Sequence, residues 1–211
     1  MSDTTAAGWV LIVGSSLFLT GAGLPPEPRR VFSAPLREHL EILNRHASRW
    51  RAMNWLMIAG VVGTSIGLAL LAAVLAPPGE EWRALAATSA YVIGGVLWIS
   101  SLAFRNTATL HAARTSAATG EIPAWLEPLG EWTGQMFRVY MVLAYATIAV
   151  FGWSILTTDV VSHGVGWFGV AFGAVLGVSF VTRFPRTSFG SIADIPALIH
   201  IATLVFGIAL L

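Results

Sequence analysis

Long intervals without charged residues alternate along the chain with short, charged ones. A helix needs about 20 apolar residues to cross a bilayer, and a charge at the bilayer centre costs at least about 2.5 kcal/mol. The uncharged intervals therefore predict six transmembrane helices, at about 8–24, 52–76, 84–104, 137–157, 160–181 and 192–211. We expect an all-α, polytopic integral membrane protein in which residues 1–211 form a single transmembrane domain, a six-helix bundle.

The distribution of Arg orients these predicted helices. The chain has 12 basic residues, all of them Arg, and six crossings place every one except Arg83 on the same side of the membrane. Because basic loops stay in the cytoplasm, that side is cytoplasmic. The N-terminus and the C-terminus are then both extracytoplasmic.

The first loop between spans also has an amphipathic pattern. Apolar residues recur at spacings of three and four within 34–51, namely at Leu36, Leu40, Leu43, Ala47 and Trp50. This period predicts a cytoplasmic juxtamembrane helix, for which Ser33 is a candidate cap. Its apolar face can meet lipid or the bundle, or it can dock a partner protein. Residues 105–136 form the longest interruption between spans, and we expect them to lie against the membrane surface.

Composition narrows the range of functions. The chain is 55% apolar and 11% charged, with a mean hydropathy of +0.72, so the lipid bilayer is its first partner, and its net charge of +1 argues against nucleic acid. It has no Cys, which excludes disulfides, iron–sulfur clusters, thiolate catalysis and Cys-based zinc sites. It also lacks a nucleotide-binding glycine fingerprint, a Walker loop, a His-Glu-x-x-His pattern and a Gly-x-Ser-x-Gly elbow. We therefore predict no catalytic residues and no metal site.

His200 is the foremost candidate for a functional residue, because it falls near the middle of the last predicted span. A polar group inside a membrane needs partners within the protein, and an intramembrane titratable residue often marks a functional site. Residues at a similar depth on the other spans form a candidate ligand-binding layer: Thr64, Ser65, Trp98, Tyr145 and Thr147. Two interpretations stay open. His200 packs helices together through a hydrogen bond, or it contributes to a ligand, proton or cofactor site.

Charged residues gather where the last two spans face the cytoplasm. Asp194 follows Ser191 by three residues, a spacing typical of a cap at a helix N-terminus. Alternatively, Asp194 forms a gating pair at the cytoplasmic mouth with Arg183 or Arg186. The cytoplasmic Arg, Arg105 among them, are also suited to contact anionic lipid headgroups.

Glycines recur every four residues on two of the predicted spans. The second span carries Gly63 and Gly67, and the fifth carries Gly169, Gly173 and Gly177. Small residues at this spacing let two helices approach closely. They predict close packing inside the bundle or, alternatively, the seam of a homodimer.

Three features of the layout carry a resemblance. The first span ends in Gly21-Ala22-Gly23-Leu24, an Arg-rich juxtamembrane helix follows, and the fifth span opens on Gly166-Trp167-Phe168-Gly169. In these respects the chain resembles uncharacterised six-helix bacterial membrane proteins, especially those of the actinobacterial type. The resemblance implies a multi-pass protein of the bacterial inner membrane and carries over no functional residue.

Three functions fit these observations. The first is a non-enzymatic protein that binds an apolar or amphipathic small molecule near His200, or that serves as an accessory subunit of a membrane complex. The second is a small proton-linked transporter that uses Asp194 and His200. The third is a redox subunit with a single-His haem or a quinone. The sequence requires no cofactor, and a haem with two His ligands is excluded because no second His lies at the depth of His200.

Overall fold

The computed structural model describes residues 2–75, 81–183 and 194–211, and all of the secondary structure in them is helical. The elements are α1 (Asp3–Ala22), α2 (Leu36–Arg45), α3 (Ala47–Leu75), α4 (Glu81–Phe104), the π-helical turn η1 (Arg105–Thr109), α5 (Leu110–Thr119), α6 (Leu126–Leu156), α7 (His163–Thr182) and α8 (Ala197–Ala209). The prediction of an all-α protein is confirmed. Four residues of the predicted spans and of the predicted cytoplasmic mouth lie outside the described residues, namely Ala76, Arg186 and residues 192–193.

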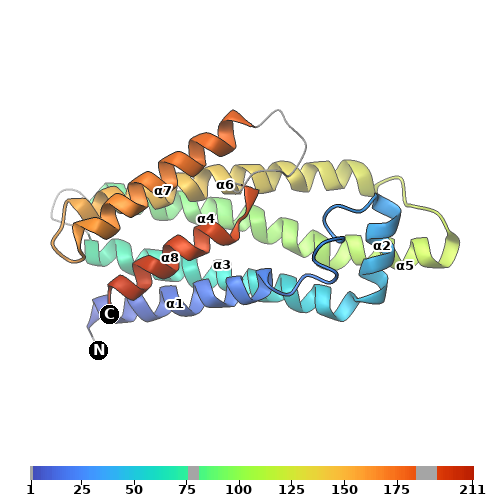
Figure 1. Cartoon of the computed structure of the whole chain (residues 1–211), viewed down its shortest axis with the longest axis horizontal. Coiled ribbons are helices and arrows are strands. Elements are labelled where there is room, and N and C mark those ends of the chain that lie inside the picture. Colours follow the sequence, from blue (N-terminus) through green and yellow to red (C-terminus); the bar gives the residue numbers. More distant parts are fainter. Residues whose placement is uncertain (1, 76–80, 184–193) are drawn as a thin grey trace.

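Five helices are long and apolar enough to cross a membrane: α1, α3, the run Trp82–Thr119, α6 and α7. They correspond to the first five predicted spans. The last helix, α8, is apolar but has only 13 residues. It is therefore about 20 Å long at 1.5 Å per residue, which is shorter than the hydrocarbon core of about 30 Å. The sixth crossing stays a prediction. The first residues of α1 and the last residues of α8 lie at the same end of the bundle (Figure 1).

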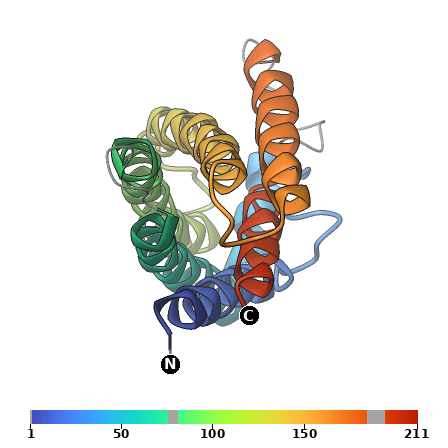
Figure 2. The same cartoon turned by 90° about the vertical axis from the view of Figure 1, so that its left-hand side faces the viewer.

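Helices α1, α3, α4, α6 and α8 are arranged as a ring (Figure 2). The side chains buried inside it include several aromatic residues. Around this ring, α1 packs on α3, α3 on α4 and α4 on α6, while α8 packs on α1 and also contacts α6. The remaining long helix, α7, lies outside the ring against α6. Because Phe18, Trp98, Tyr140 and His200 are all buried, the ring collects side chains that are far apart in the sequence.

Glycines make the closest helix contacts. A methyl group added to Gly14 of α1 would come within 2.5 Å of the Thr64 backbone nitrogen on α3, and one added to Gly63 would meet the Gly14 Cα. Between α6 and α7, a methyl group on Gly152 would come within 2.4 Å of the Val170 nitrogen. Four glycines predicted to pack helices thus lie against neighbouring helices of the same chain: Gly63, Gly67, Gly169 and Gly173. A methyl group added to Gly177 would lie 3.3 Å from the Tyr145 Cβ, so Gly177 also makes a close contact with α6.

The juxtamembrane helix is shorter than the sequence predicts. It is α2, Leu36–Arg45, and it ends at His46, whose φ of −118° leaves the helical region before α3 begins. Ser33 does not cap it, because the Ser33 hydroxyl donates to the Arg29 carbonyl and Pro35 occupies the cap position. The apolar face of α2 is buried and packs on α5, so it is covered by the bundle itself.

Residues 105–119 extend α4 through η1 and α5. The expectation that residues 105–136 lie against the membrane surface stays a prediction. The segment is rich in Ala, which favours helix, and the helix stops at Gly120, whose φ of +75° suits only glycine well. Arg37 of α2 donates to the Gly120 carbonyl at 3.1 Å. Together, α2, α5 and the start of α3 build the end of the molecule opposite the termini (Figure 1).

Candidate functional site

His200 lies in the first turn of α8 and is fully buried. Its ring stacks on Phe18 of α1, with centroids 3.6 Å apart and planes 14° apart. Its Nδ1 is hydrogen-bonded to the Thr64 hydroxyl of α3 at 3.2 Å, and its Nε2 makes a longer contact of 3.4 Å with the Tyr140 hydroxyl of α6. His200 therefore joins three helices to α8, and both of its ring nitrogens are engaged.

The occupied nitrogens limit what His200 can do chemically. A haem iron binds a free imidazole nitrogen, and neither nitrogen of His200 is free. Among the described residues, no carboxylate contacts the ring that would accept or supply a proton. One turn along α8, the Thr203 hydroxyl bonds to Ser15 of α1 at 2.8 Å. These contacts place His200 among the buried side chains that pack α1, α3 and α6 against α8.

The other residues of the predicted polar layer divide between the interior and the helix contacts. Thr64 lies at His200, whereas the adjacent Ser65 donates to the Val61 carbonyl of its own helix. Thr147 donates to the Ala87 carbonyl at 3.0 Å and so ties α6 to α4. Tyr145 lies at the contact with α7, where Gly173 and Gly177 pack against it. The layer thus converges in part, on His200 and Thr64.

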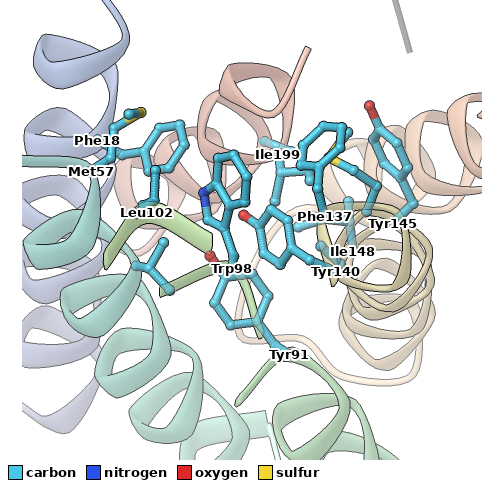
Figure 3. Packing of buried hydrophobic residues seen from close by; sticks show 14 of the residues in the cluster. Phe18, Met57, Tyr91, Trp98, Leu102, Phe137, Tyr140, Tyr145, Ile148 and Ile199 are labelled. Carbon is cyan, nitrogen blue, oxygen red and sulfur yellow. The ribbon is translucent and has the colours of Figure 1, made fainter. Parts of the chain in front are cut away.

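Trp98 belongs to a group of packed aromatic side chains beside His200, which we call the aromatic wall: Tyr91, Trp98, Phe137 and Tyr140. It stacks on Tyr140, with centroids 5.7 Å apart and planes 5° apart, and it contacts Phe137 at 4.9 Å. Tyr91 approaches Tyr140 edge-on at 6.2 Å. Figure 3 shows the hydroxyls of Tyr91 and Tyr140 directed toward Trp98. Sequence reasoning missed both of these Tyr residues, although a Tyr within an apolar span is itself a polar signal.

Several buried polar atoms have no hydrogen-bond partner within the described parts of the chain. They belong to four residues on α3, α4 and η1: Asn54 (Oδ1), Tyr91 (hydroxyl), Trp98 (Nε1) and Asn106 (both amide atoms). The Tyr91 hydroxyl lies beside Tyr140 and Thr64 without a hydrogen bond of good geometry to either. Each such atom costs about 1–3 kcal/mol, and a membrane interior supplies no water to relieve it.

The turn η1 lies at the end of the interior that is opposite the termini. Trp50 of α3 donates its indole N–H to the Arg105 carbonyl at 3.1 Å, and Asn54, one turn further along α3, donates to the Trp50 carbonyl at 2.8 Å. The Arg105 guanidinium carbon lies 4.9 Å from the centroid of the Trp98 ring. A π-helical turn widens the helix locally and often occurs at a functional site. Sequence periodicity gives no signal for this turn.

The predicted cytoplasmic mouth is only partly described. Asp194 precedes α8 and interacts electrostatically with Tyr145, while Arg183 ends α7 and is exposed. Arg186 lies outside the described residues. Across the described ranges, no three His, Asp or Glu side chains gather in an arrangement that could hold a metal ion.

Comparison of the chain with known proteins does not assign a family. No family model, no curated protein and no solved structure matches it. The resemblance to six-helix bacterial membrane proteins therefore stays a prediction from the layout of the sequence. The contacts around His200, Trp98 and Arg105 are the basis for the function proposed below.

Proposed function

We propose that this protein is a non-enzymatic membrane protein that binds an amphipathic small molecule in the aromatic interior beside His200. The observation that carries the proposal is a pair of buried polar groups, Trp98 Nε1 and the Tyr91 hydroxyl, that have no hydrogen-bond partner among the described residues. A ligand with an apolar body and a few polar groups matches the aromatic wall. Binding would restore the hydrogen bonds that the bundle alone leaves unmade.

His200 holds the wall in place in this proposal. Its contacts to Phe18, Thr64 and Tyr140 fix the position of Tyr140, on which Trp98 stacks. Since Tyr91 and Trp98 are almost completely buried, a ligand gains access only when these side chains move apart. The contact with Tyr140 is the longer of the two hydrogen bonds that His200 makes, so we expect it to break first.

We also propose that α8 is part of a sixth crossing of a bacterial inner membrane and that both termini lie on its extracytoplasmic side. Two observations support this placement. The ends of α1 and α8 lie at the same end of the bundle, as an even number of crossings requires. The described Arg residues of α2, η1 and α5 lie at the opposite end, which the positive-inside rule assigns to the cytoplasm.

Tyr91→Phe and Tyr140→Phe are expected to have opposite effects on the ligand-free protein. Tyr91→Phe removes a hydroxyl that has no partner, so we expect it to leave stability unchanged or to raise it by up to about 1 kcal/mol. Tyr140→Phe removes the contact to His200 and is expected to cost about 1 kcal/mol. Thermal unfolding in mild detergent measures both effects.

Tyr91→Phe also tests ligand binding. Native mass spectrometry of the full chain, released gently from its membrane, reports the mass of any molecule that stays bound. We expect a small molecule on the wild-type protein and a lower bound fraction on Tyr91→Phe, because the hydroxyl would then be used by the ligand. A wild-type protein that carries no bound molecule, or Tyr91→Phe with an unchanged bound fraction, would contradict the proposal.

A further inference from the structure

A positive charge that has no counter-ion among the described residues lies at the cytoplasmic end of the aromatic interior. Arg105 is only partly exposed, and its guanidinium group lies over Trp98 within cation–π distance. Among the residues that the structure describes, no carboxylate forms an ion pair with it. Glu27 and Glu38 instead pair with basic residues of the α1–α2 connection and α2. The charge of Arg105 is therefore not neutralised by an ion pair within the described part of the chain.

Across the described ranges, no carboxylate contributes to the electrostatics of Arg105. Four further carboxylates at this end are exposed to solvent, namely Glu41, Glu121, Glu127 and Glu131. Asp194, which is partly buried, interacts with Tyr145. His39, on α2, donates from Nδ1 to the Val31 carbonyl at 2.6 Å. Burial lowers the pKa of His39, and the charge of Arg105 acts in the same direction. The surroundings of Arg105 are thus neutral or positive, and a partly buried cation in such surroundings favours an anion.

The residue that follows Arg105 carries hydrogen-bonding groups that have no partner among the described residues. Asn106 follows Arg105 in η1, and both atoms of its buried amide lack a partner among the described residues. A guanidinium group and an amide NH2 are both donors to an oxyanion, and the guanidinium matches the planar spacing of two phosphate oxygens. The two residues are consecutive in the π-helical turn, a kind of element that often occurs at functional sites.

We infer that Arg105 and Asn106 bind the anionic phosphate group of the ligand, whose apolar part then lies against Trp98. The position of the apolar part rests on the proposed function, whereas the anion site rests on η1 alone. The phosphate group can belong to a membrane lipid or can be free inorganic phosphate. Arg105 is the positioning cation in either case, and Trp98 holds its guanidinium group in place.

Binding of three probes to the full chain tests this site. The probes are phosphatidylglycerol, zwitterionic phosphatidylcholine and inorganic phosphate, each titrated against purified protein in mild detergent and followed by native mass spectrometry. We expect phosphatidylglycerol to bind the wild-type protein at least about tenfold more tightly than Arg105→Gln, the loss that follows from one charge-assisted contact. Arg105→Lys should keep part of the affinity. Arg114→Gln is the matched control, because Arg114 is exposed on α5 and carries the same charge.

The outcomes separate the source of the anion and the two proposals. Inorganic phosphate that competes with phosphatidylglycerol identifies free phosphate as a ligand of the same site, whereas failure to compete identifies the lipid. Equal binding of phosphatidylglycerol to the wild-type protein and to Arg105→Gln overturns the anion site, even if Tyr91→Phe reduces binding. Loss in Arg105→Gln with no effect of Tyr91→Phe supports the anion site and counts against the interior site. If Arg105→Gln does not fold, Asn106→Ala takes its place with the same expected loss.

Discussion

Gly152→Ala is expected to destabilise the protein by about 3 kcal/mol or more, the largest effect of any single added methyl group on α6. The methyl group would lie 2.4 Å from the Val170 nitrogen and 2.7 Å from the Gly166 carbonyl oxygen, both of which are backbone atoms of α7. Backbone atoms cannot move aside as a flexible side chain can, so the two helices must separate. Overpacking of this kind costs about 1–3 kcal/mol or more, and association of helices in lipid depends on close contact.

The same helix provides the control. Gly134 is also in α6, but a methyl group added there would meet nothing within 4 Å. Since Ala favours helix over Gly by up to about 1 kcal/mol, we expect Gly134→Ala to leave stability unchanged or to raise it. Reversible unfolding in mixed micelles, followed by circular dichroism, gives both free energies. Equal stabilities of Gly152→Ala and Gly134→Ala would show that α6 and α7 do not pack in this way.

His200→Ala is expected to cost about 3–5 kcal/mol. The substitution opens a cavity against Phe18, and large-to-small changes in a packed core fall in this range. It also leaves the hydroxyls of Thr64 and Tyr140 without their shared partner, at about 1–3 kcal/mol for each buried group. Because these contacts tie three helices to α8, the loss should also loosen α8 from the ring.

His163→Ala provides the matched control for His200→Ala. His163 is exposed at the start of α7, so its removal should change stability by less than about 0.5 kcal/mol. Hydrogen exchange measured by mass spectrometry would show faster exchange in α8 for His200→Ala alone. If His200→Ala unfolds at the wild-type temperature and exchanges at the wild-type rate, His200 does not hold the ring together.

The order of elements follows from the sequence, but the rotation of each helix does not. The uncharged intervals predict the five long helices because placing a charge at the bilayer centre has a large free-energy cost. Depth along a span, however, says nothing about the direction in which a side chain points. Thr64 and Ser65 have nearly the same depth but differ by about 100° around α3. Thr64 therefore reaches His200, while Ser65 bonds within its own helix.

The candidate site depends on which helices become neighbours, and that order is a property of packing. Nothing in the sequence places α8 between α1 and α6, so the pairing of Tyr140 with His200 could not be predicted. Polar residues are common at the ends of apolar spans, and Asn54, Arg105 and Asn106 all lie at such ends. That amide atoms of Asn54 and Asn106 lack partners among the described residues can be seen only once the surrounding side chains are placed.

The most direct test of the account is an experimental density map of the protein extracted with its surrounding lipid. We predict an elongated density that contacts Trp98 Nε1 and the Tyr91 hydroxyl and reaches Arg105 at the end of the bundle opposite the termini. Side chains packed as they are here, with no density between them and Arg105 paired with a carboxylate of the chain, would contradict the central claim that the interior binds an amphipathic molecule.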